Sequence, residues 1–552
     1  MWDRQFAQRT RDIRAGERTR TMGRAVIAGA IAVLAGCGGS GGDGPAPSAP
    51  VVSGTDGTST PQVKTLAEMC AAYASNTLPH NAKITKTEMR AHSESLPEVC
   101  IVRGAIVSSP NSTINWAVEL PAAASWNGKT LTVGGGAFDG FIPTDSAWYQ
   151  AMIGKSANPF VKMSSDSGHQ SRGFEWAIDD VALRNHAFDA NHFTLEVGTQ
   201  IASEFYGKKP SRRYHIGQSN GGRSGLVSAQ RYPLDYDGVI ALEPAISQQG
   251  HEANNVPLNQ HIFGDPANWL NAAKIELYAK AETKACDGLD GLEDGVIGNV
   301  EACKYVPTEL LCTGAENDNC LTAGQIESIR QIYTDRQVAV NLADGIKGYP
   351  RFGRGGAATS DWQAYMFGSS FAARDSFNYM VGDEAAKVVT RNTANYFMTF
   401  DPSLYQAEWT RLSELIDATN PDISAFADKG GKMLIWYGLA DACVSLYRTV
   451  EYFDSVKKTL GASKVHGFAR LITSPSVGHN QDGPGAGEID LVGAMDAWVE
   501  HGQAPDNLVA SKFAAGGSTP EFQRPACEYP KFPRWDGVGD PKQAASFVCS
   551  AT

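Results

Sequence analysis

The feature that most constrains this chain is a serine in a glycine-rich turn, Gly217-Gln-Ser219-Asn-Gly221. A short run with β propensity ends at Gly217, and a helix-compatible stretch, residues 224–231, follows the turn. A strand, a tight turn and a helix are the context in which a Gly-x-Ser-x-Gly serine becomes a nucleophile. Glycine is needed because a side chain two residues before or after the serine would collide with so sharp a turn. An ordinary Gly/Ser turn is the alternative, since the chain has 57 glycines.

Length and charge exclude several classes of protein. With 552 residues the chain has room for about two to four domains, and its 42% hydrophobic and 20% charged residues are typical of a soluble globular protein. The formal net charge of −12 argues against nucleic acid or an anionic membrane surface as a partner, because no basic stripe offsets it. The arginines between residues 4 and 24 are the exception, and we assign them to targeting.

The first 37 residues are typical of a bacterial lipoprotein signal. Basic residues precede an apolar run, residues 25–35, which is too short to span a bilayer. The run ends in Leu34-Ala35-Gly36-Cys37, which resembles the lipobox, in which the cysteine is lipidated. Met22 stands where a signal of typical length would begin. We therefore expect an exported protein, held in the outer membrane only through lipidated Cys37 or, if the signal is an ordinary cleaved one, periplasmic or secreted.

Composition also indicates the domain organisation. Residues 38–63 form a Gly/Ser/Pro/Thr-rich tether with no pattern that could pack. Strands alternate with helices in residues 64–245 and again in residues 430–552, which predicts an α/β fold with a doubly wound sheet and a ligand site beyond the strand C-termini. Residues 246–429 differ from both, with helical segments, Gly-rich loops and many aromatic residues. We interpret this stretch as one large inserted lid domain.

Ten cysteines agree with a compartment outside the cytosol. Without Cys37 nine remain, an odd number. Proximity along the chain indicates the pairs Cys70–Cys100, Cys286–Cys303, Cys312–Cys320 and Cys527–Cys549, with Cys443 unpaired. Other connectivities stay open, because sequence alone does not prove pairing.

A second glycine cluster lies upstream of the serine turn. A β run at residues 129–133 leads into Gly134-Gly135-Gly136-Ala-Phe-Asp-Gly140. Glycine lets a backbone N–H approach a substrate without a Cβ in the way. We expect the N–H of Asn220 and one N–H from Gly135 or Gly136 to hold an oxyanion. A plain Gly-rich turn is the alternative.

Candidate partners for the serine lie near the end of the chain. A serine hydroxyl is a poor nucleophile that needs a base, and the base needs an acid to hold its tautomer. A predicted strand at residues 431–438 leads into a loop with Asp441, and the next, at residues 468–473, leads into a Gly/Pro loop with His479. Of the 11 histidines, only His479 has this placement. The order Ser219, Asp441, His479 predicts a catalytic triad; a turn-capping role is the alternative for Asp441.

An acidic loop in the insertion is a candidate cation site. Its sequence is Cys286-Asp287-Gly-Leu-Asp290-Gly-Leu292-Glu-Asp294-Gly-Val296. Three carboxylates at intervals of three and four residues can converge on one hard cation, and backbone carbonyls can complete an oxygen cage. The predicted ligands of a structural Ca²⁺ are Asp287, Asp290 and Asp294 with the carbonyls of Leu292 and Val296. A solvated acidic loop is the alternative.

Together these motifs are similar to those of the tannase and feruloyl esterase family of α/β hydrolases, from about residue 65 to the C-terminus. Besides the acidic loop, the matching segments are Gly217-Gln-Ser219-Asn-Gly-Gly-Arg223, Ala229-Gln-Arg-Tyr-Pro233, Phe400-Asp-Pro402, Gly430-Gly-Lys432, Tyr437-Gly-Leu-Ala-Asp441, Gly478-His479, Trp498-Val-Glu-His-Gly502, Ala504-Pro-Asp506 and the cysteine pair Cys527 and Cys549. The resemblance implies phenolic acid esters, including plant-polymer-derived esters, as substrates, a lid that shapes the pocket, and a structural calcium in that lid. Bacterial hydrolases of terephthalate monoesters belong to the same family.

Two positions depart from the family pattern. The family usually has a disulfide between a cysteine just before the nucleophile and one just after the histidine, where this chain has Gln218 and Asn480. Their joint replacement indicates that the bridge was lost as a unit, and an amide pair could replace it by hydrogen bonding. The second departure is Glu243, where we expect a small residue. It either alters substrate preference or pairs with a neighbouring arginine.

The sequence therefore predicts a serine carboxylic-ester hydrolase that acts on feruloyl or galloyl esters through an acyl-enzyme. One alternative is a hydrolase of aromatic dicarboxylate monoesters or hydroxyacid oligomers, whose acidic product needs a cationic clamp. Candidates for this clamp are Arg351, Arg354, Arg391 and Arg411. The other alternative is a catalytically silent, calcium-stabilised surface lipoprotein that binds a polymer.

Overall fold

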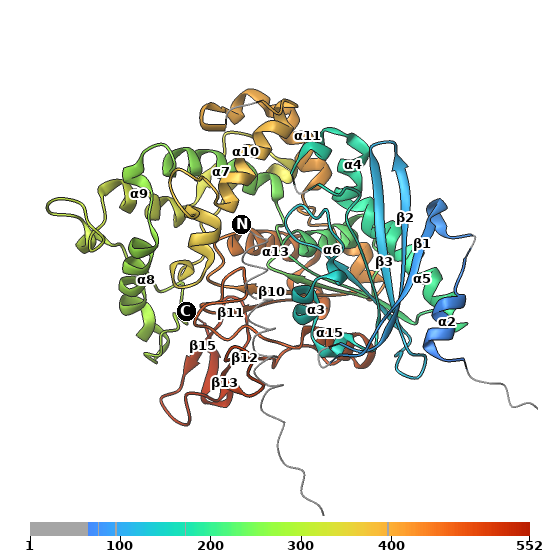
Figure 1. The fold of residues 1–552 in the computed structure, drawn as a ribbon. Helices are drawn as coiled ribbons and strands as arrows, with labels where there is room; N and C mark the ends of the chain where they lie inside the picture. Colours follow the sequence, from blue (N-terminus) through green and yellow to red (C-terminus); the bar gives the residue numbers. More distant parts are fainter. Residues whose placement is uncertain (1–63, 76, 94–95, 172, 395–396, 552) are drawn as a thin grey trace, which may run out of the picture. The chain divides into compact units, whose positions relative to one another are not determined.

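The computed structural model describes residues 64–75, 77–93, 96–171, 173–394 and 397–551 (Figure 1). The predicted signal, the tether and Cys37 lie outside the described residues. The chain from Leu66 onward forms one compact unit. Within the described part of the chain, no helix has the length and apolar character needed to cross a bilayer.

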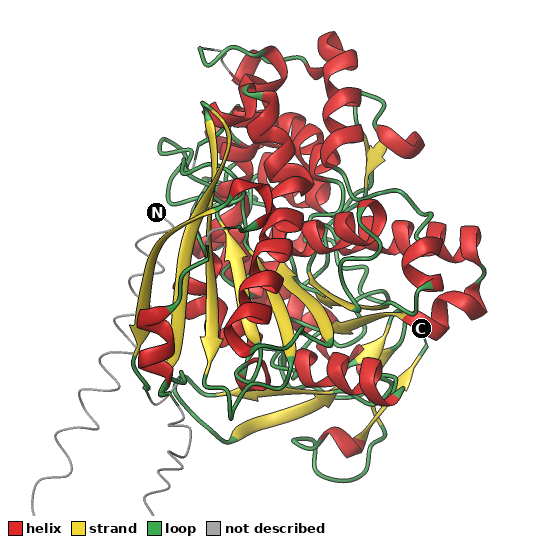
Figure 2. Ribbon diagram, turned by 90° about the vertical axis from the view of Figure 1, so that its right-hand side faces the viewer, coloured by secondary structure: helices red, strands yellow, loops and turns green. Residues whose placement is uncertain are grey.

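A ten-stranded sheet runs through the centre of this unit (Figures 1 and 2). In spatial order its strands are β1 (Lys83–Arg90), β2 (Val99–Ser109), β3 (Ser112–Pro121), β5 (Val161–Ser165), β4 (Lys129–Gly134), β6 (Arg212–Gln218), β7 (Gly238–Leu242), β10 (Lys432–Gly438), β11 (Ala469–Ser474) and β14 (Cys527–Glu528). The strands from β5 to β11 in that order are parallel. Antiparallel strands β1–β3 and β14 extend the two edges.

The central parallel strands are apolar on both faces because helices cover both faces. Alternate residues of each strand contribute to two different cores. On one face Ile240 and Leu434 pack with residues of α3 (Ala147–Ile153) and α15 (Leu491–His501). On the other face Val239 and Ile435 pack with residues of α5 (Ala190–Tyr206), α6 (Asn220–Arg231) and α13 (Leu446–Leu460). The predicted doubly wound α/β fold is confirmed.

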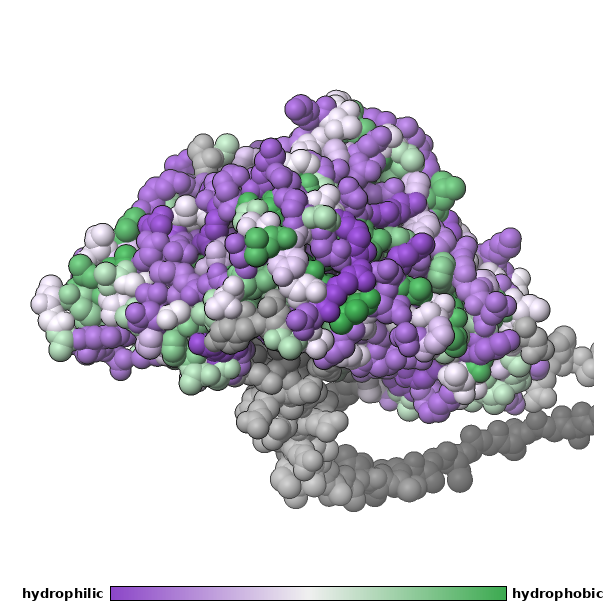
Figure 3. Space-filling model, turned by 90° about the horizontal axis from the view of Figure 1, so that it is seen from above, coloured by the Kyte–Doolittle hydropathy of each residue, from purple (hydrophilic) through white to green (hydrophobic). Residues whose placement is uncertain are grey.

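A long, mainly helical insertion separates β7 from β10. Its helices are α7 (Gln248–Ile262), α8 (Ala272–Cys286), α9 (Ala323–Ile332), α10 (Phe377–Thr390), α11 (Gln406–Ile416) and α12 (Ser424–Asp428), with a small two-stranded sheet of β8 (Arg336–Gln337) and β9 (Gly348–Tyr349). The insertion contacts the sheet beyond the C-terminal ends of the parallel strands, where Asp361 accepts the N–H of His479. The surface on this side is mostly hydrophilic, with hydrophobic residues in small separate groups (Figure 3).

Four disulfides are present, with the pairs expected from the sequence: Cys70–Cys100, Cys286–Cys303, Cys312–Cys320 and Cys527–Cys549. The first joins α2 (Leu66–Ala72) to β2, and the last joins β14 to β16 (Phe547–Ser550). Cys443 is free and buried. Disulfides in this number are typical of chains outside the cytosol and agree with export.

The structure also contains elements that the sequence pattern did not predict. Strand β5 lies between β3 and β4, and four short strands outside the central sheet, with mixed burial, follow α15: β12 (Val509–Phe513), β13 (Pro520–Pro525), β15 (Phe532–Trp535) and β16. Helix α6 begins at Asn220, four residues before the predicted start, because the glycines after Ser219 are part of its first turn. Short strands and Gly-rich helix starts have weak periodicity, which explains both differences.

Candidate active site

Ser219 lies at the sharp turn between β6 and α6. Its backbone has φ 58° and ψ −120°, a strained conformation for a residue with a side chain. Its N–H donates to the carbonyl of Leu242 on β7 at 2.9 Å, and its own carbonyl accepts the N–H of Ala245 at 3.1 Å. These backbone bonds hold a half-buried serine in the geometry of a nucleophile elbow.

Gly217 and Gly221 are required because backbones pack closely at the turn. A Cβ on Gly217 would lie 2.5 Å from the carbonyl carbon of Gly221, and a Cβ on Gly221 would lie 2.5 Å from the carbonyl oxygen of Gly135. Strands β4 and β6 pair in parallel with Gly134 opposite Gly217. The two segments expected to supply oxyanion donors, at Gly135 and Asn220, are therefore neighbours at one edge of the sheet.

A buried polar network joins these two segments. The Asn220 side chain donates to Asp139 and accepts from Nε of Arg223 at 2.7 Å. Asp139 also accepts from Ser167, and burial raises the pKa of Asp139 to about 6. Arg223 has no exposed surface, and its guanidinium also donates to the backbone carbonyls of His186, Ala187 and Ile416. The network orients Asn220 relative to the Gly-rich segment that carries Asp139.

Asp441 and His479 meet in the loops that follow β10 and β11. His479 Nδ1 lies 2.8 Å from Asp441 Oδ2, and both side chains are buried. Asp441 Oδ1 accepts the N–H groups of Cys443 at 2.7 Å and Val444 at 2.9 Å, so one oxygen caps the turn while the other bonds to the histidine. Burial opposes the charged imidazolium, but the carboxylates of Asp441 and Asp361 outweigh burial and raise the pKa of His479.

Gln218 joins the serine turn to the histidine loop. Its side-chain Nε2 donates to the backbone carbonyl of His479 at 2.5 Å and to Oε2 of Glu243 at 2.7 Å. The suggested amide pair between Gln218 and Asn480 is not formed. The Asn480 side chain bonds instead to two hydroxyl groups of the insertion. Gln218 therefore connects the two loops by a hydrogen bond from its side chain to the backbone of His479.

Glu243 is completely buried beside the histidine. Its Oε1 accepts the N–H of Gly438 at 3.1 Å, and its Oε2 lies 3.7 Å from His479 Nδ1. Burial and the nearby charge of Asp441 raise the pKa of Glu243 well above its usual range. The alternative of a pairing with a neighbouring arginine is wrong: among the described residues no arginine pairs with Glu243, and the basic group beside its carboxyl is the imidazole of His479.

Two residues of the insertion belong to this cluster and were not predicted. Asp361 Oδ2 accepts the N–H groups of Ala442 at 3.0 Å and His479 at 2.8 Å, which ties the acid loop to the histidine loop. Burial and the charge of Asp441 raise the pKa of Asp361 to about 7. The Tyr365 ring lies edge-on to His479, with ring centroids 5.4 Å apart. No local motif marks either residue, because the contacts arise only from tertiary packing.

A series of aromatic rings in contact with one another extends from Tyr365. Its ring packs on Phe377 at 5.7 Å, Phe377 lies 6.3 Å from Phe138, and Phe138 lies 3.8 Å from Phe174. Phe138 follows the glycine cluster, whereas Phe377 begins α10 of the insertion. The four buried rings form one aromatic cluster between the insertion and the segments that follow β4 and β5.

The acidic loop after α8 has the oxygen donors that were expected to bind calcium. Its carboxylates accept N–H groups within the loop: Asp287 from Asp294 and Gly295, Asp290 from Leu292, and Asp294 from Val296. Asp294 also pairs with Arg524. The loop sets three carboxylates against the one arginine of the described chain that pairs with it, and burial, with the charges of Asp294 and Asp287, raises the pKa of Asp290 to about 7. Carboxylate and carbonyl oxygens are the ligands that Ca²⁺ prefers, and this donor set fits it in kind.

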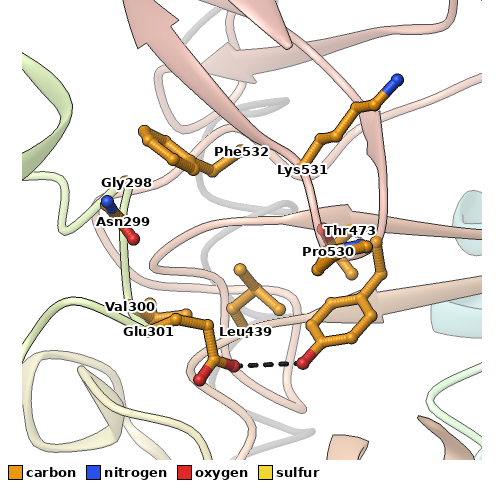
Figure 4. A pocket seen from close by; sticks show the side chains of 10 residues that line it. Gly298, Asn299, Val300, Glu301, Leu439, Thr473, Pro530, Lys531 and Phe532 are labelled. Atoms are coloured by element: carbon orange, nitrogen blue, oxygen red, sulfur yellow. Dashed lines mark hydrogen bonds between the residues drawn. The ribbon is translucent and has the colours of Figure 1, made fainter. Parts of the chain in front are cut away.

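The acidic loop is also connected to the histidine loop. The N–H of Ile297 donates to Oγ of Ser476 at 2.9 Å, three residues before His479. The segment that follows, residues 298–301, lines a small pocket with Leu439, Thr473 and residues 529–532 (Figure 4). Glu301 accepts a hydrogen bond from the Tyr529 hydroxyl there at 3.2 Å. The residue directly after the acidic loop is therefore hydrogen-bonded to the segment that leads to His479.

The four arginines considered as clamps for an acidic product are all paired with carboxylates. The pairs are Arg351 with Glu301 and Asp335, Arg354 with Glu282, Arg391 with Asp180 and Glu408, and Arg411 with Asp180 and Glu408. Their charges are balanced locally, which weakens the case for such a clamp.

Comparisons with known proteins identify the family of this chain. The family model described as tannase and feruloyl esterase matches residues 100–550. An uncharacterised esterase of Agrobacterium fabrum is 31% identical over 526 residues, covering 88% of this chain and 93% of the relative. A mono(2-hydroxyethyl) terephthalate hydrolase of Piscinibacter sakaiensis is 27% identical over 542 residues, covering 84% and 86%.

Among solved structures, feruloyl esterase B from Aspergillus oryzae superposes with a TM-score of 0.75 at 24% identity, covering 88% of this chain and 100% of that one. The fold is therefore that of an α/β hydrolase, and the family match spans most of the described chain. The chain belongs to the tannase and feruloyl esterase family and is a carboxylic ester hydrolase.

Proposed function

We propose that this esterase hydrolyses esters of phenolic acids, of the feruloyl or galloyl type, by a serine mechanism with an acyl-enzyme intermediate. The observation that supports it most directly is the 2.8 Å contact between His479 Nδ1 and Asp441 Oδ2, in the loops next to the strained Ser219. Gln218 connects the serine turn to the histidine loop, so the three residues belong to one connected cluster.

In the first half of the reaction, Ser219 Oγ attacks the ester carbonyl while His479 Nε2 takes its proton. Asp441 keeps the proton on Nδ1 and stabilises the imidazolium. The N–H of Asn220 and one N–H from Gly135 or Gly136 hold the oxyanion, and removal of one such donor typically costs about 100- to 1,000-fold in rate. His479 then gives its proton to the leaving alcohol, which departs and leaves the acyl-enzyme.

In the second half, water attacks the acyl carbonyl and His479 takes one of its protons. The tetrahedral intermediate collapses, Ser219 Oγ leaves and recovers the proton from His479, and the free acid is released. Asp361 supports both halves, because it bonds to the N–H of His479 and keeps the histidine loop in place.

The aromatic cluster beside His479 supports an aromatic acyl group as the preferred substrate. Because Tyr365 and Phe377 belong to the insertion, we assign the insertion the role of a lid that shapes the pocket. A terephthalate monoester is the second candidate substrate, favoured by the named activity of the Piscinibacter relative. The paired arginines count against it.

Calcium is proposed as a structural ion of the acidic loop. Asp287, Asp290 and Asp294 with the carbonyls of Leu292 and Val296 would hold it. The bound ion would supply positive charge where Arg524 alone does not balance the carboxylates. Through Ile297 and Ser476 an ordered loop would stabilise the segment before His479.

For location, we propose export with a lipid anchor at Cys37. The lipobox-like Leu34-Ala35-Gly36-Cys37 and the four disulfides support it. Mass spectrometry of the protein isolated from a bacterial host would detect a diacylglyceryl modification on Cys37. A mature N-terminus at another residue would contradict the anchor.

The test of the function is an ester panel with purified protein: methyl ferulate, a gallate ester and mono(2-hydroxyethyl) terephthalate. We expect turnover of a phenolic ester that disappears in Ser219→Ala. If neither phenolic ester is hydrolysed, the substrate assignment is wrong, and hydrolysis of the terephthalate ester alone would establish the second candidate. Retained turnover in Ser219→Ala would reject the serine mechanism.

A further inference from the structure

Two buried carboxylates, not one, face the imidazole of His479. Nδ1 lies 2.8 Å from Oδ2 of Asp441 and 3.7 Å from Oε2 of Glu243. Each of the three side chains offers an atom that lies within 4.8 Å of the other two. A triad needs only one acid at this nitrogen, so the proposed reaction does not require the second carboxylate.

The backbone and the neighbouring side chains hold Glu243 in this position. Its N–H donates to the carbonyl of Trp436 at 2.8 Å, and its φ of 43° is a strained value for a non-glycine residue. Its two carboxyl oxygens accept from Gln218 and from the N–H of Gly438. Gln218 also bonds to the His479 carbonyl, so one amide fixes Glu243 and the histidine relative to each other.

Topology explains how two acids reach one histidine. Glu243 follows β7 and Asp441 follows β10, and these strands are adjacent and parallel, with Leu242 opposite Trp436. Carboxyl ends of neighbouring parallel strands open onto the same edge of the sheet. Either strand can therefore present a carboxylate to Nδ1 of His479.

We propose that Glu243 is a second acid for His479: a positioning residue that acts through the histidine and takes over the Nδ1 proton bond when Asp441 is removed. The proposal rests on the serine mechanism proposed above. In the intact enzyme Asp441 is the working acid, because it accepts three hydrogen bonds from N–H groups and lies closer to Nδ1.

The charges around Glu243 determine when it can act. The titratable groups that face it are Asp441, Asp361, His479, Cys443, Tyr365 and Tyr437. Adjacent buried carboxylates cannot all ionise without a compensating charge, and burial raises the pKa of Glu243 in the same direction. Both effects favour the protonated form of Glu243 in the intact enzyme. It must release that proton to water before its carboxylate can accept the hydrogen bond from Nδ1.

The experiment compares Asp441→Ala with the double variant Asp441→Ala/Glu243→Gln across pH 5 to 10, with kcat and KM measured separately. Loss of the triad acid in a serine hydrolase typically costs about 10,000-fold in kcat. We expect the double variant to show that loss, and Asp441→Ala to lose only about 100-fold with KM little changed. The kcat of Asp441→Ala should rise with pH as Glu243 ionises, and this rise should be absent from the double variant.

Three controls make the comparison decisive. Asp441→Ala/Glu252→Gln removes another buried glutamate, one whose side chain bonds to Gln248 and Gln249, and should behave like Asp441→Ala. Near-ultraviolet circular dichroism checks the fold, and Asp441→Asn, which keeps an oxygen for the N–H groups of Cys443 and Val444, replaces Asp441→Ala if the latter does not fold. Ser219→Ala sets the background.

If both variants are folded and their kcat values are equal at every pH, the proposal that Glu243 is a second acid for His479 is overturned. If Ser219→Ala itself remains active, the proposed serine mechanism fails instead, so the two failures are distinguishable. A kcat that is higher in Asp441→Ala than in the double variant but does not rise with pH would also overturn the proposal. Such a result would mean that Glu243 supports the structure without acting as an ionised acid.

Discussion

Acidic side chains are concentrated in two regions of this esterase, and the two regions differ in the groups to which the carboxylates bond. At the sheet edge that holds the proposed triad, here called the catalytic edge, Asp441, Glu243 and Asp361 are buried and bonded to groups from other segments. In the acidic loop, Asp287 and Asp290 bond mostly to N–H groups of the same loop. The first arrangement places carboxylates against a histidine, whereas, among the described residues, the second has one arginine, Arg524, paired with Asp294 and no histidine in contact with its carboxylates. We therefore assign the proposed chemical role to the carboxylates that contact a histidine and the proposed structural role to those that bond within their own loop.

The two regions are nevertheless coupled. Ile297, directly after the acidic loop, bonds to Ser476 in the segment that leads to His479. A change at the catalytic edge should alter turnover with little effect on stability. A change in the loop should alter stability first and turnover only through this contact.

The largest effect is expected at the histidine. His479→Ala should lower kcat by about 10,000-fold or more, because removal of the base disables the serine. The thermal midpoint should stay within a few degrees of wild type in calcium-containing buffer. Steady-state kinetics and calorimetry measure the two quantities; a folded variant with kcat within tenfold of wild type would remove His479 from the mechanism.

Calcium removal should show the opposite pattern. With free Ca²⁺ at about 100 times its dissociation constant, a site in the folded state adds about 2.7 kcal/mol of stability. A chelator should therefore lower the thermal midpoint, and Asp290→Asn should abolish the response to calcium. Glu293→Gln is the matched control, because Glu293 is exposed in the same loop and outside the predicted ligand set. A midpoint that is unchanged by chelator and by added calcium would contradict the calcium site.

Gln218 tests the contact between the serine turn and the histidine loop. Gln218→Ala removes its bonds to the His479 carbonyl and to Glu243, and hydrogen bonds of this kind are worth about 0.5–1.5 kcal/mol each. We expect kcat to fall about tenfold with KM little changed. Asn480→Ala is the control, since its partners are in the insertion, and should cost less. A larger loss of kcat in Asn480→Ala than in Gln218→Ala would show that Gln218 is not the residue that connects the serine turn to the histidine loop.

The smallest effect is a displacement of the pH profile. His479 must be neutral at Nε2 to take a proton, and Asp441 with Asp361 raises the pKa of His479 above 6.5. The value of kcat/KM should therefore fall as the pH drops, with the midpoint of the acid limb above 6.5. Chelation should leave this midpoint in place, because the acidic loop does not face the imidazole. A midpoint well below 6.5 would mean that burial outweighs the carboxylates.

The parallel core and the proposed triad positions could be read from the sequence because their signals are local. A strand that ends in Gly217, a glycine two residues after Ser219, and acids or histidines directly after predicted strands need no knowledge of distant contacts. Strand pairing then brings Asp441 and His479 together, because parallel neighbours end at the same edge. The cysteine pairs were predictable since each closes a short stretch of chain.

The rest depends on tertiary packing. Asp361 and Tyr365 contact His479 across more than 110 residues of sequence, and nothing in their own segment marks them. Glu243 was visible as an unusual residue, yet its partners were not, because the fold buries it against Gln218 and Gly438. Short strands such as β12 and β16 have little alternation to recognise.

The most direct test of the account is covalent labelling with a serine-reactive aryl phosphonate, followed by peptide mass spectrometry. A nucleophile elbow with a histidine base predicts one adduct, on the peptide that contains Ser219, with loss of ester hydrolysis in proportion to labelling. Ser219→Ala should take up no label. Full activity after exposure to the reagent, or an adduct on another serine that abolishes activity, would contradict the central claim.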